Sequence, residues 1–317
     1  MKFILTIATI LVLLTNNLSA ETKRLAYLVS DIRIPFWNIM SKGIKSKAKE
    51  LGYELDIYSA DNIKKKEIQN TVKALKSGIE GLIISPINSS TASTILMFAA
   101  KSNIPVVISD IGTDSGEYVS FISSNNTEGA YQIGKVLVKK MKELGFDKDG
   151  TVGIISIPQK RANGKARTSG FMKAMNEANI KAAGLLQQVD FSYKETYEHS
   201  MKLIKENPDL KALWLQGSDK YKGAFDAIKE SGNKGKILLV CFDAELEFID
   251  MIHNGTLVGA AMQQPYLMGS KAVESLVNYN NGQKVQKNQK LEILAISKDN
   301  VQEKLPIIKR NVLGIKE

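Results

Sequence analysis

Short apolar runs, many of them rich in β-branched residues, alternate along the chain with longer stretches in which apolar residues recur at a helical period. Runs of the first kind predict β-strands, and stretches of the second kind predict amphipathic helices. In the first series, the predicted strands cover residues 25–29, 55–58, 81–84, 105–108 and, at the sheet edge, 118–122, and the predicted helices cover 36–51, 65–76 and 90–102. A second series follows residue 125, with strands predicted over 152–157, 184–189, 212–215, 237–242 and 257–262.

This order of elements predicts the fold class. Strands that are apolar almost throughout, with helices between them, indicate parallel sheets covered on both faces. Two such series predict two doubly wound, Rossmann-like α/β lobes, and a length of 317 residues suits two domains of about 150 residues each. Ligands of open α/β sheets bind at the carboxyl ends of the strands, so two lobes can face one another across a binding cleft.

The N-terminus departs from the alternating pattern. Met1 and Lys2 form a short basic start, residues 3–14 are apolar apart from threonine, and the following polar stretch ends in small residues at Ala20. This layout predicts a secretory signal peptide over residues 1–20, because the apolar run is shorter than the roughly 20 residues that span a bilayer. An uncleaved N-terminal anchor is the alternative. Either form predicts an exported protein, which we expect in the periplasm.

The charge, cysteine and histidine content argue against nucleic-acid binding and against a His-rich metal site. The chain carries 43 Lys plus Arg against 33 Asp plus Glu, a net charge of +10, but the lysines are scattered over predicted helix faces. Scattered charge on an exported chain argues against a nucleic-acid partner. The single cysteine, Cys241, lies in an apolar run, so we expect its thiol to be buried. With only two histidines in the chain, a His-rich metal site is disfavoured. We expect no cofactor.

Polar and aromatic residues gather where the predicted strands end. Phe36 and Trp37 follow the first strand and Asp110 ends the fourth, while the second series ends its strands near Phe191, Asp243 and Gln263. These positions meet at the cleft if the strands form two parallel sheets.

Eight segments together resemble one known family. In chain order they are VSDIRIPFW, GLIISPINSS, IPVVISD, FISSNNTEGA, ARTSGF, VDFSY, LLVCFDAE and LVGAAMQQP. This series resembles the type I periplasmic sugar-binding proteins, with the ribose-binding branch closest, over nearly all of the chain after residue 20. The resemblance implies two lobes joined by a three-strand hinge. The first lobe would comprise residues 21–124 plus 265–290, and the second lobe residues 125–264 plus 291–317.

The resemblance also implies a ligand site made of two kinds of residue. Aromatic rings would pack on the C–H face of a sugar, and charged or amide side chains would bind its hydroxyl groups. The residues that match the family's site are Phe36, Trp37, Asp110, Arg167, Phe191, Asp243 and Gln263. The alternatives are that the aromatics belong to the core, that the aspartates cap helices, that Arg167 lies on the surface and that Gln263 serves the hinge.

Four positions depart from the family's pattern. Ile34 and Ser218 stand where the family often has Asn, Ile111 where it often has Arg, and Asn125 where it often has Asp. At least two side chains that would bind hydroxyls are therefore apolar here. We expect a ligand that is less hydroxylated than ribose, carries a methyl group or is oriented differently.

The predicted function is that of a periplasmic solute-binding protein. It would capture a sugar or sugar-like molecule by hinge closure and deliver it to the permease of an ABC importer. The alternative is a sensory binding protein that presents its ligand state to a histidine kinase or chemoreceptor. An enzyme is disfavoured, because the chain has no recognisable nucleophile–base pair, metal-ligand spacing or Gly-x-Ser-x-Gly motif.

Overall fold

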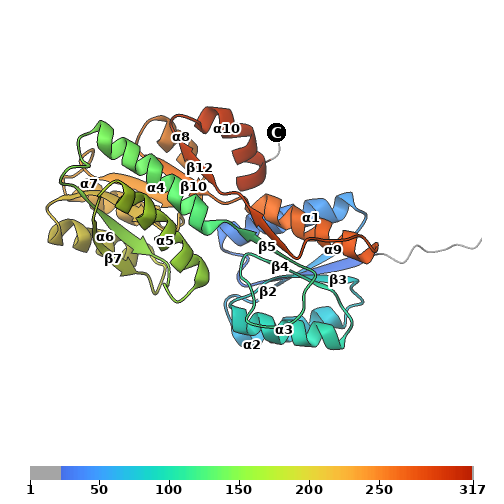
Figure 1. Ribbon diagram of the computed structural model, residues 1–317. Coiled ribbons are helices and arrows are strands. Elements are labelled where there is room, and N and C mark those ends of the chain that lie inside the picture. The colour runs from blue at the N-terminus through green and yellow to red at the C-terminus, as the bar shows by residue number, and fades with distance from the viewer. Residues whose placement is uncertain (1–22, 316–317) are drawn as a thin grey trace, which may run out of the picture.

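The structure, a computed structural model, describes residues 23–315. These residues form two α/β lobes that lie side by side, each built around a six-stranded sheet (Figure 1). The predicted signal peptide, residues 1–20, lies outside the described residues. Among residues 23–315, no helix is both long enough and apolar enough to cross a membrane.

The first lobe contains an entirely parallel sheet with the strand order β11-β5-β4-β3-β1-β2. Its strands are β1 (Arg24–Val29), β2 (Glu54–Ser59), β3 (Gly81–Ser85), β4 (Val106–Ser109), β5 (Ser120–Ser124) and β11 (Asn288–Leu291). The prediction of an edge strand near β5 is wrong, because β11 pairs with β5 and takes the edge. The hydrophobic pattern did not reveal β11 because its sequence, NQKL, is mostly polar.

The second lobe contains a sheet with the strand order β12-β10-β9-β8-β6-β7. Its strands are β6 (Thr151–Ser156), β7 (Ala182–Gln187), β8 (Leu210–Leu215), β9 (Leu238–Phe242), β10 (Gly259–Met262) and β12 (Leu294–Ser297). Only β12, at the edge, pairs antiparallel within this sheet. Both sheets therefore have the doubly wound, mostly parallel arrangement that the sequence predicts.

Helices cover both faces of the first sheet. On one face lie α1 (Pro35–Glu50) and α9 (Pro265–Asn280), and on the other lie α2 (Lys64–Leu75) and α3 (Ser89–Lys101). Alternate residues of β1 serve the two cores: Tyr27 packs with Met40 of α1, whereas Leu28 packs with Ile95 of α3. This double burial explains why β1 is apolar throughout.

The second lobe repeats this layering. Helices α4 (Asn126–Glu143) and α5 (Ala162–Glu177) cover one face. The other face carries α6 (Tyr193–Glu206), α7 (Tyr221–Glu230), α8 (Phe248–His253) and α10 (Val301–Ile307), followed by a π-helix, η1 (Ile308–Val312). Cys241 is fully buried in this core, and burial raises the pKa of its thiol, which confirms the predicted inert position.

Two segments from opposite ends of the chain pack closely in the first lobe. Helix α9 lies beside α1 (Figure 1), and a Cβ atom at Gly43 of α1 would lie 2.1 Å from the carbonyl oxygen of Tyr266 in α9. Only glycine permits this approach of the two backbones. The first lobe is therefore completed by a helix that follows all strands of the second lobe except the edge strand β12 in the sequence.

The chain crosses between the two sheets three times, after β5, after β10 and after β11. Hydrogen bonds join these crossings. The Asn125 N–H donates to the Leu291 carbonyl at 2.9 Å, and Gln264 Nε2 donates to the Glu292 carbonyl at 2.9 Å. Asn311 Nδ2 also donates to Gln264 Oε1 at 2.8 Å. The three segments thus form a connected hinge, while the residue boundaries predicted for the lobes stay a prediction.

Candidate ligand-binding site

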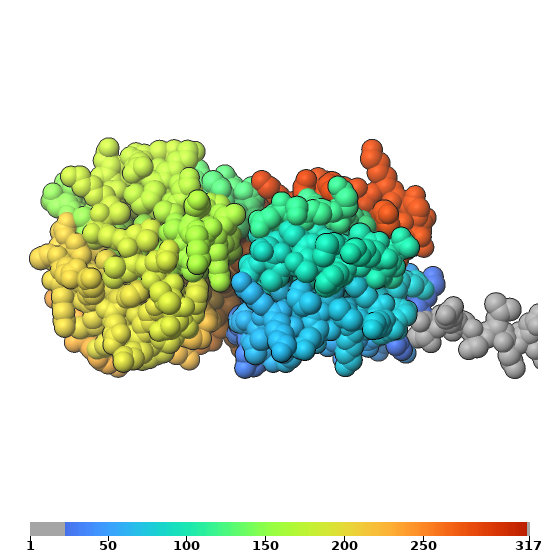
Figure 2. All heavy atoms as spheres, turned by 90° about the horizontal axis from the view of Figure 1, so that it is seen from below, coloured from blue at the N-terminus to red at the C-terminus, as the bar shows by residue number. Residues whose placement is uncertain are grey.

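A pocket of about 80 Å³ lies between the two lobes. Figure 2, a view from below, shows the lobes meeting along a narrow seam. The pocket's walls differ in character. Apolar side chains around the start of α1, with Pro265 and Val312, form one wall, which is lined by Ile34, Pro35, Phe36, Ile39, Pro265 and Val312. The other wall belongs to loops that follow β8, β9 and β10, and is lined by Gly217, Ser218, Asp219, Asp243, Ala244, Glu245 and Gln263.

Two aspartates occupy matching positions in the lobes. Asp110 follows β4 and Asp243 follows β9, and both have left-handed backbones, with φ of 69° and 67°. Each N–H donates at 2.9 Å to a carbonyl of the next strand, Ile122 for Asp110 and Ala261 for Asp243. Aspartate tolerates this conformation better than most residues, and the turn ends each strand at the cleft.

Arg167 lies buried beside Asp243, with only 5% of its side chain exposed. Its Nε donates to Asn126 Oδ1 at 2.8 Å and its Nη1 to the Gln216 carbonyl at 2.6 Å. Nη1 also lies 3.8 Å from Asp243 Oδ2, and the guanidinium stacks 3.8 Å from the centroid of the Phe242 ring. These contacts fix the guanidinium plane, so Arg167 is a buried residue of the second lobe and not a surface arginine.

Gln263 extends this polar network into the pocket. Its Nε2 donates to Asp243 Oδ1 at 2.6 Å. Its Oε1 is buried and, among the described residues, has no hydrogen-bond partner. A buried acceptor without a partner is unfavourable, and Gln263 lines the pocket.

The charges interact across the seam. Burial raises the pKa of Asp110 to about 6, and the fields of Arg167 and Arg161 from the other lobe act against that rise, while Asp243 adds to it. Burial likewise raises the pKa of Asp243, opposed by Arg167 and by the hydrogen bond from Gln263. One carboxylate from each lobe therefore lies in the field of the same buried arginine.

The three predicted aromatic residues lie in different settings. Phe36 lines the pocket, and Trp37 meets it edge-on with the ring centroids 4.9 Å apart. Trp37 itself is only 7% exposed and packs in the core of the first lobe, so the structure does not bring it to the pocket wall. Its role as a ligand contact stays a prediction.

Phe191 is held on the loop after β7. Its backbone is left-handed, with φ of 52°, and its N–H donates to Glu195 Oε2 at 2.8 Å. The same carboxylate also accepts from the N–H groups of Val189 and Asp190. The Arg161 guanidinium lies 5.6 Å from the centroid of the Phe191 ring. Phe191 therefore lies near Arg161, and the positive charge of Arg161 interacts with Asp110 of the other lobe.

Sequence reasoning missed four residues around the site, namely Asn126, Arg161, Gln216 and Glu245. Gln216 and Glu245 follow strand ends, a position that already pointed to the other site residues. Asn126 and Arg161 gave no such signal, because one begins a helix and the other is an exposed arginine in a loop. Their roles depend on how distant segments pack.

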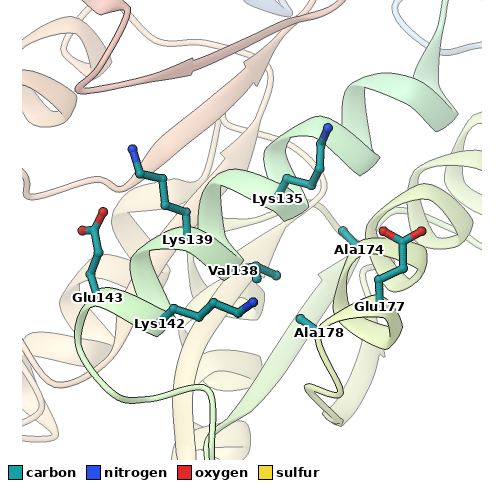
Figure 3. A pocket seen from close by; sticks show the side chains of 8 residues that line it. All are labelled: Lys135, Val138, Lys139, Lys142, Glu143, Ala174, Glu177 and Ala178. Carbon is teal, nitrogen blue, oxygen red and sulfur yellow. The ribbon is translucent and has the colours of Figure 1, made fainter.

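A larger hollow, of about 510 Å³, lies elsewhere on the second lobe. Figure 3 shows it between α4 and α5, lined by Lys135, Val138, Lys139, Lys142, Glu143, Ala174, Glu177 and Ala178. Several of these charged side chains already have partners, such as Lys139 with Asp299 and Glu177 with Lys173. An open groove of solvated, paired charges provides little to bind a small ligand, so the pocket between the lobes is the candidate site.

The sequence profile of a family described as "Periplasmic binding protein domain" matches residues 25–284. The chain belongs to this family. The ribose import binding protein of Haemophilus influenzae is 28% identical to this periplasmic binding protein over 297 residues, covering 92% of this chain and 98% of the relative. The D-allose-binding periplasmic protein of Escherichia coli is 23% identical over 286 residues, covering 87% and 91% of the two chains.

Solved structures agree in fold. A carbohydrate transporter solute-binding protein from Agrobacterium radiobacter, in complex with D-arabinose, superposes with a TM-score of 0.81 at 22% identity, covering 93% of this chain and 100% of that one. These findings confirm the type I periplasmic sugar-binding family and the fold class predicted from the sequence. They also confirm the expectation that the protein is not an enzyme, because the family consists of substrate-binding proteins. Family membership implies a periplasmic location.

Proposed function

We propose that this periplasmic binding protein captures a small sugar or sugar-like ligand between its lobes and delivers it to the permease of an ABC importer. One observation carries the proposal: Asp243 and Gln263, with the buried Arg167 beside Asp243, line the pocket wall opposite the wall that contains Phe36. A rigid ring and a set of charged hydrogen-bonding groups on opposite walls suit a molecule with an apolar face and polar edges. The names of the relatives, which include ribose import and D-allose-binding proteins, support the same ligand class.

The two lobes supply different parts of the contact. In this proposal Phe36 and Asp110 of the first lobe and Arg167, Phe191, Asp243 and Gln263 of the second bind the ligand together. A ligand that touches both lobes binds the closed form more tightly than the open form, and this difference in affinity drives closure about the hinge. The permease then selects the closed form. A sensor kinase or chemoreceptor could read the same closed form, and that output stays the alternative prediction.

The apolar wall bears on which sugar fits. Ile34 and Ile111 are partly buried and pack against the core of the first lobe, and Ile34 lines the pocket. An isoleucine cannot bind a hydroxyl, and burying one against it costs about 1–3 kcal/mol. The proposed ligand therefore presents a methyl or deoxy position to Ile34.

Calorimetry on the protein without residues 1–20 tests this function. The probes are pentoses and hexoses, each beside its deoxy analogue. We expect one molecule to bind per chain, with a deoxy sugar preferred over its parent. Small-angle X-ray scattering with that sugar should show a smaller radius of gyration, as hinge closure requires. The absence of binding to every probe would contradict the proposal.

A further inference from the structure

Glu245 is a carboxylate of the pocket wall without a cation beside it. It follows β9, lines the pocket and is partly buried. Its Oε1 accepts a hydrogen bond from Ser218 Oγ at 2.8 Å. Within residues 23–315, no Lys, Arg or His nitrogen lies within 4.0 Å of its carboxylate oxygens, so its charge is not paired.

The neighbouring carboxylates differ from Glu245 in this respect. Asp243 lies near Arg167, Asp219 pairs with Lys220 at 2.8 Å, and Glu247 pairs with Lys222 at 3.4 Å. The charged groups that act on Glu245 are all acidic, namely Asp219, Asp243 and Glu247, and together with burial they raise the pKa of its carboxyl group. The wall around Glu245 therefore has an excess of negative charge.

The uncharged polar groups of this wall offer acceptors as well. The Ser218 hydroxyl donates its hydrogen bond to Glu245, and the Gln263 amide donates an N–H to Asp243. The Gln263 Oε1 is left buried without a partner among the described residues. Gln263 is only 3% exposed and lines the pocket, so a donor group of a ligand bound there would satisfy this oxygen.

Closure of the lobes makes an unpaired charge here more costly. The opposite wall includes Ile34, Phe36 and Ile39, and its apolar side chains provide no hydrogen-bond donor. A carboxylate that loses water without gaining a cation or donors is strongly destabilised. A ligand with a positive charge and several N–H donors would supply what the protein lacks at this place.

We propose that the ligand carries a protonated amino group that binds Glu245 and Gln263 Oε1, so that the favoured ligand class is aminodeoxy sugars. An ammonium group combines one positive charge with three donors, whereas a hydroxyl group supplies one donor and no charge. Ser218 holds the Glu245 carboxylate in place for this contact. This inference rests on the proposed function, because it names the chemistry of the sugar that the same pocket binds.

The test compares matched ligands by calorimetry at pH 6.5, where the amines are protonated. The probes are D-glucosamine, D-galactosamine and D-mannosamine, each beside its parent hexose and its neutral N-acetyl derivative. We expect at least one amine to bind about tenfold or more tightly than its parent, as expected for a charge-assisted contact. We expect N-acetylation to abolish that gain, because it removes the charge.

Two variants test whether Glu245 causes the preference for the amine. Glu245→Gln keeps the size of the side chain and an oxygen for Ser218 but removes the charge, so the ratio of amine to parent affinity should fall to about one. Glu230→Gln is the matched control, since Glu230 accepts a hydrogen bond from Tyr197, does not line the pocket and is not among the charges that act on Glu245; its ratio should equal that of the wild type. Thermal unfolding of both variants without ligand checks that they fold.

The outcomes separate the two proposals. Parent or deoxy sugars that bind as tightly as the amines would overturn the amine inference and leave the sugar-binding function standing. An amine preference that survives in Glu245→Gln would overturn the role of Glu245. The absence of binding to every sugar and aminodeoxy sugar would overturn both proposals.

Discussion

Asp110 and Asp243 are equivalent residues of the two lobes: each follows a strand in a left-handed turn and donates its N–H to the adjacent strand. The equivalence is geometric but not electrostatic. Asp243 lies near Arg167 within its own lobe, whereas Asp110 depends on charges from the other lobe. The ionisation of Asp110 is therefore sensitive to the separation of the lobes.

The first prediction concerns stability and pH. The pKa of Asp110 rises from its ordinary 3.8 to about 6 on folding. Between these values the folded protein binds more protons than the unfolded chain, so the free energy of unfolding falls as the pH rises through that window. Asp110→Asn should remove this dependence and increase the free energy of unfolding at pH 7.5 by about 1–3 kcal/mol. Urea denaturation of the ligand-free wild type and variant at pH 4.5 and 7.5 measures these free energies of unfolding.

Asp114→Asn is the control for that variant, because Asp114 lies on the same loop and is exposed. It should leave the pH profile unchanged. An Asp110→Asn protein that is less stable than wild type at pH 7.5 would show that the attraction of Arg167 and Arg161 outweighs the effect of burial.

The second prediction concerns Arg167. Arg167→Ala removes two buried hydrogen bonds and leaves Asp243 without its cation. We expect the free energy of unfolding to fall by about 2–4 kcal/mol and ligand affinity to fall at least about a hundredfold. Lys173→Ala, an exposed change on the same helix, should alter neither quantity. Unchanged affinity in calorimetry would remove Arg167 from the proposed site.

The third prediction concerns specificity. Ile34→Asn introduces an amide at the apolar wall, where it can bind a hydroxyl. The affinity ratio between a parent sugar and its deoxy analogue should shift towards the parent by about tenfold, or about 1.4 kcal/mol. Ile63→Asn, an exposed change outside the pocket, is the control. An identical ratio in wild type and Ile34→Asn would place the deoxy position elsewhere.

The fourth prediction uses intrinsic fluorescence. Trp214 is fully buried, stacks on Phe171 with the centroids 3.9 Å apart and lines neither pocket described above, so Trp214→Phe leaves Trp37 as the only tryptophan. Because Trp37 touches the pocket only through Phe36, ligand binding should shift its emission weakly. Phe36→Ala in the same background should expose the indole and move the emission to longer wavelength. A large ligand-induced shift with Phe36 intact would mean that Trp37 contacts the ligand directly.

The sequence predicted most of the strands because both faces of each sheet are covered, which makes the strands continuous apolar runs. It did not reveal β11, because its sequence, NQKL, is mostly polar, or β12, which is a run of only four residues, LAIS, at the antiparallel edge. The strand-end rule found Asp110 and Asp243 for a physical reason, since parallel strands end at the cleft.

Other parts of the site could not be predicted because they arise from packing between distant segments. The partners of Arg167 are Asn126 and the Gln216 carbonyl, 41 and 49 residues away. Phe36 and Trp37 are adjacent in sequence, but the turn of α1 sends one ring to the pocket and the other to the core. The lack of a cation near Glu245 is also invisible in the sequence, because it depends on the pairing of Lys220 with Asp219 and of Lys222 with Glu247.

The packing of α9 against α1 has a consequence for biosynthesis. The first lobe needs α9 and β11, and these are made only after the ribosome has produced every strand of the second sheet except β12. The N-terminal half therefore emerges with one face of its sheet covered by α1 alone, and it cannot reach its final state early. The first lobe can be completed only when most of the chain is available.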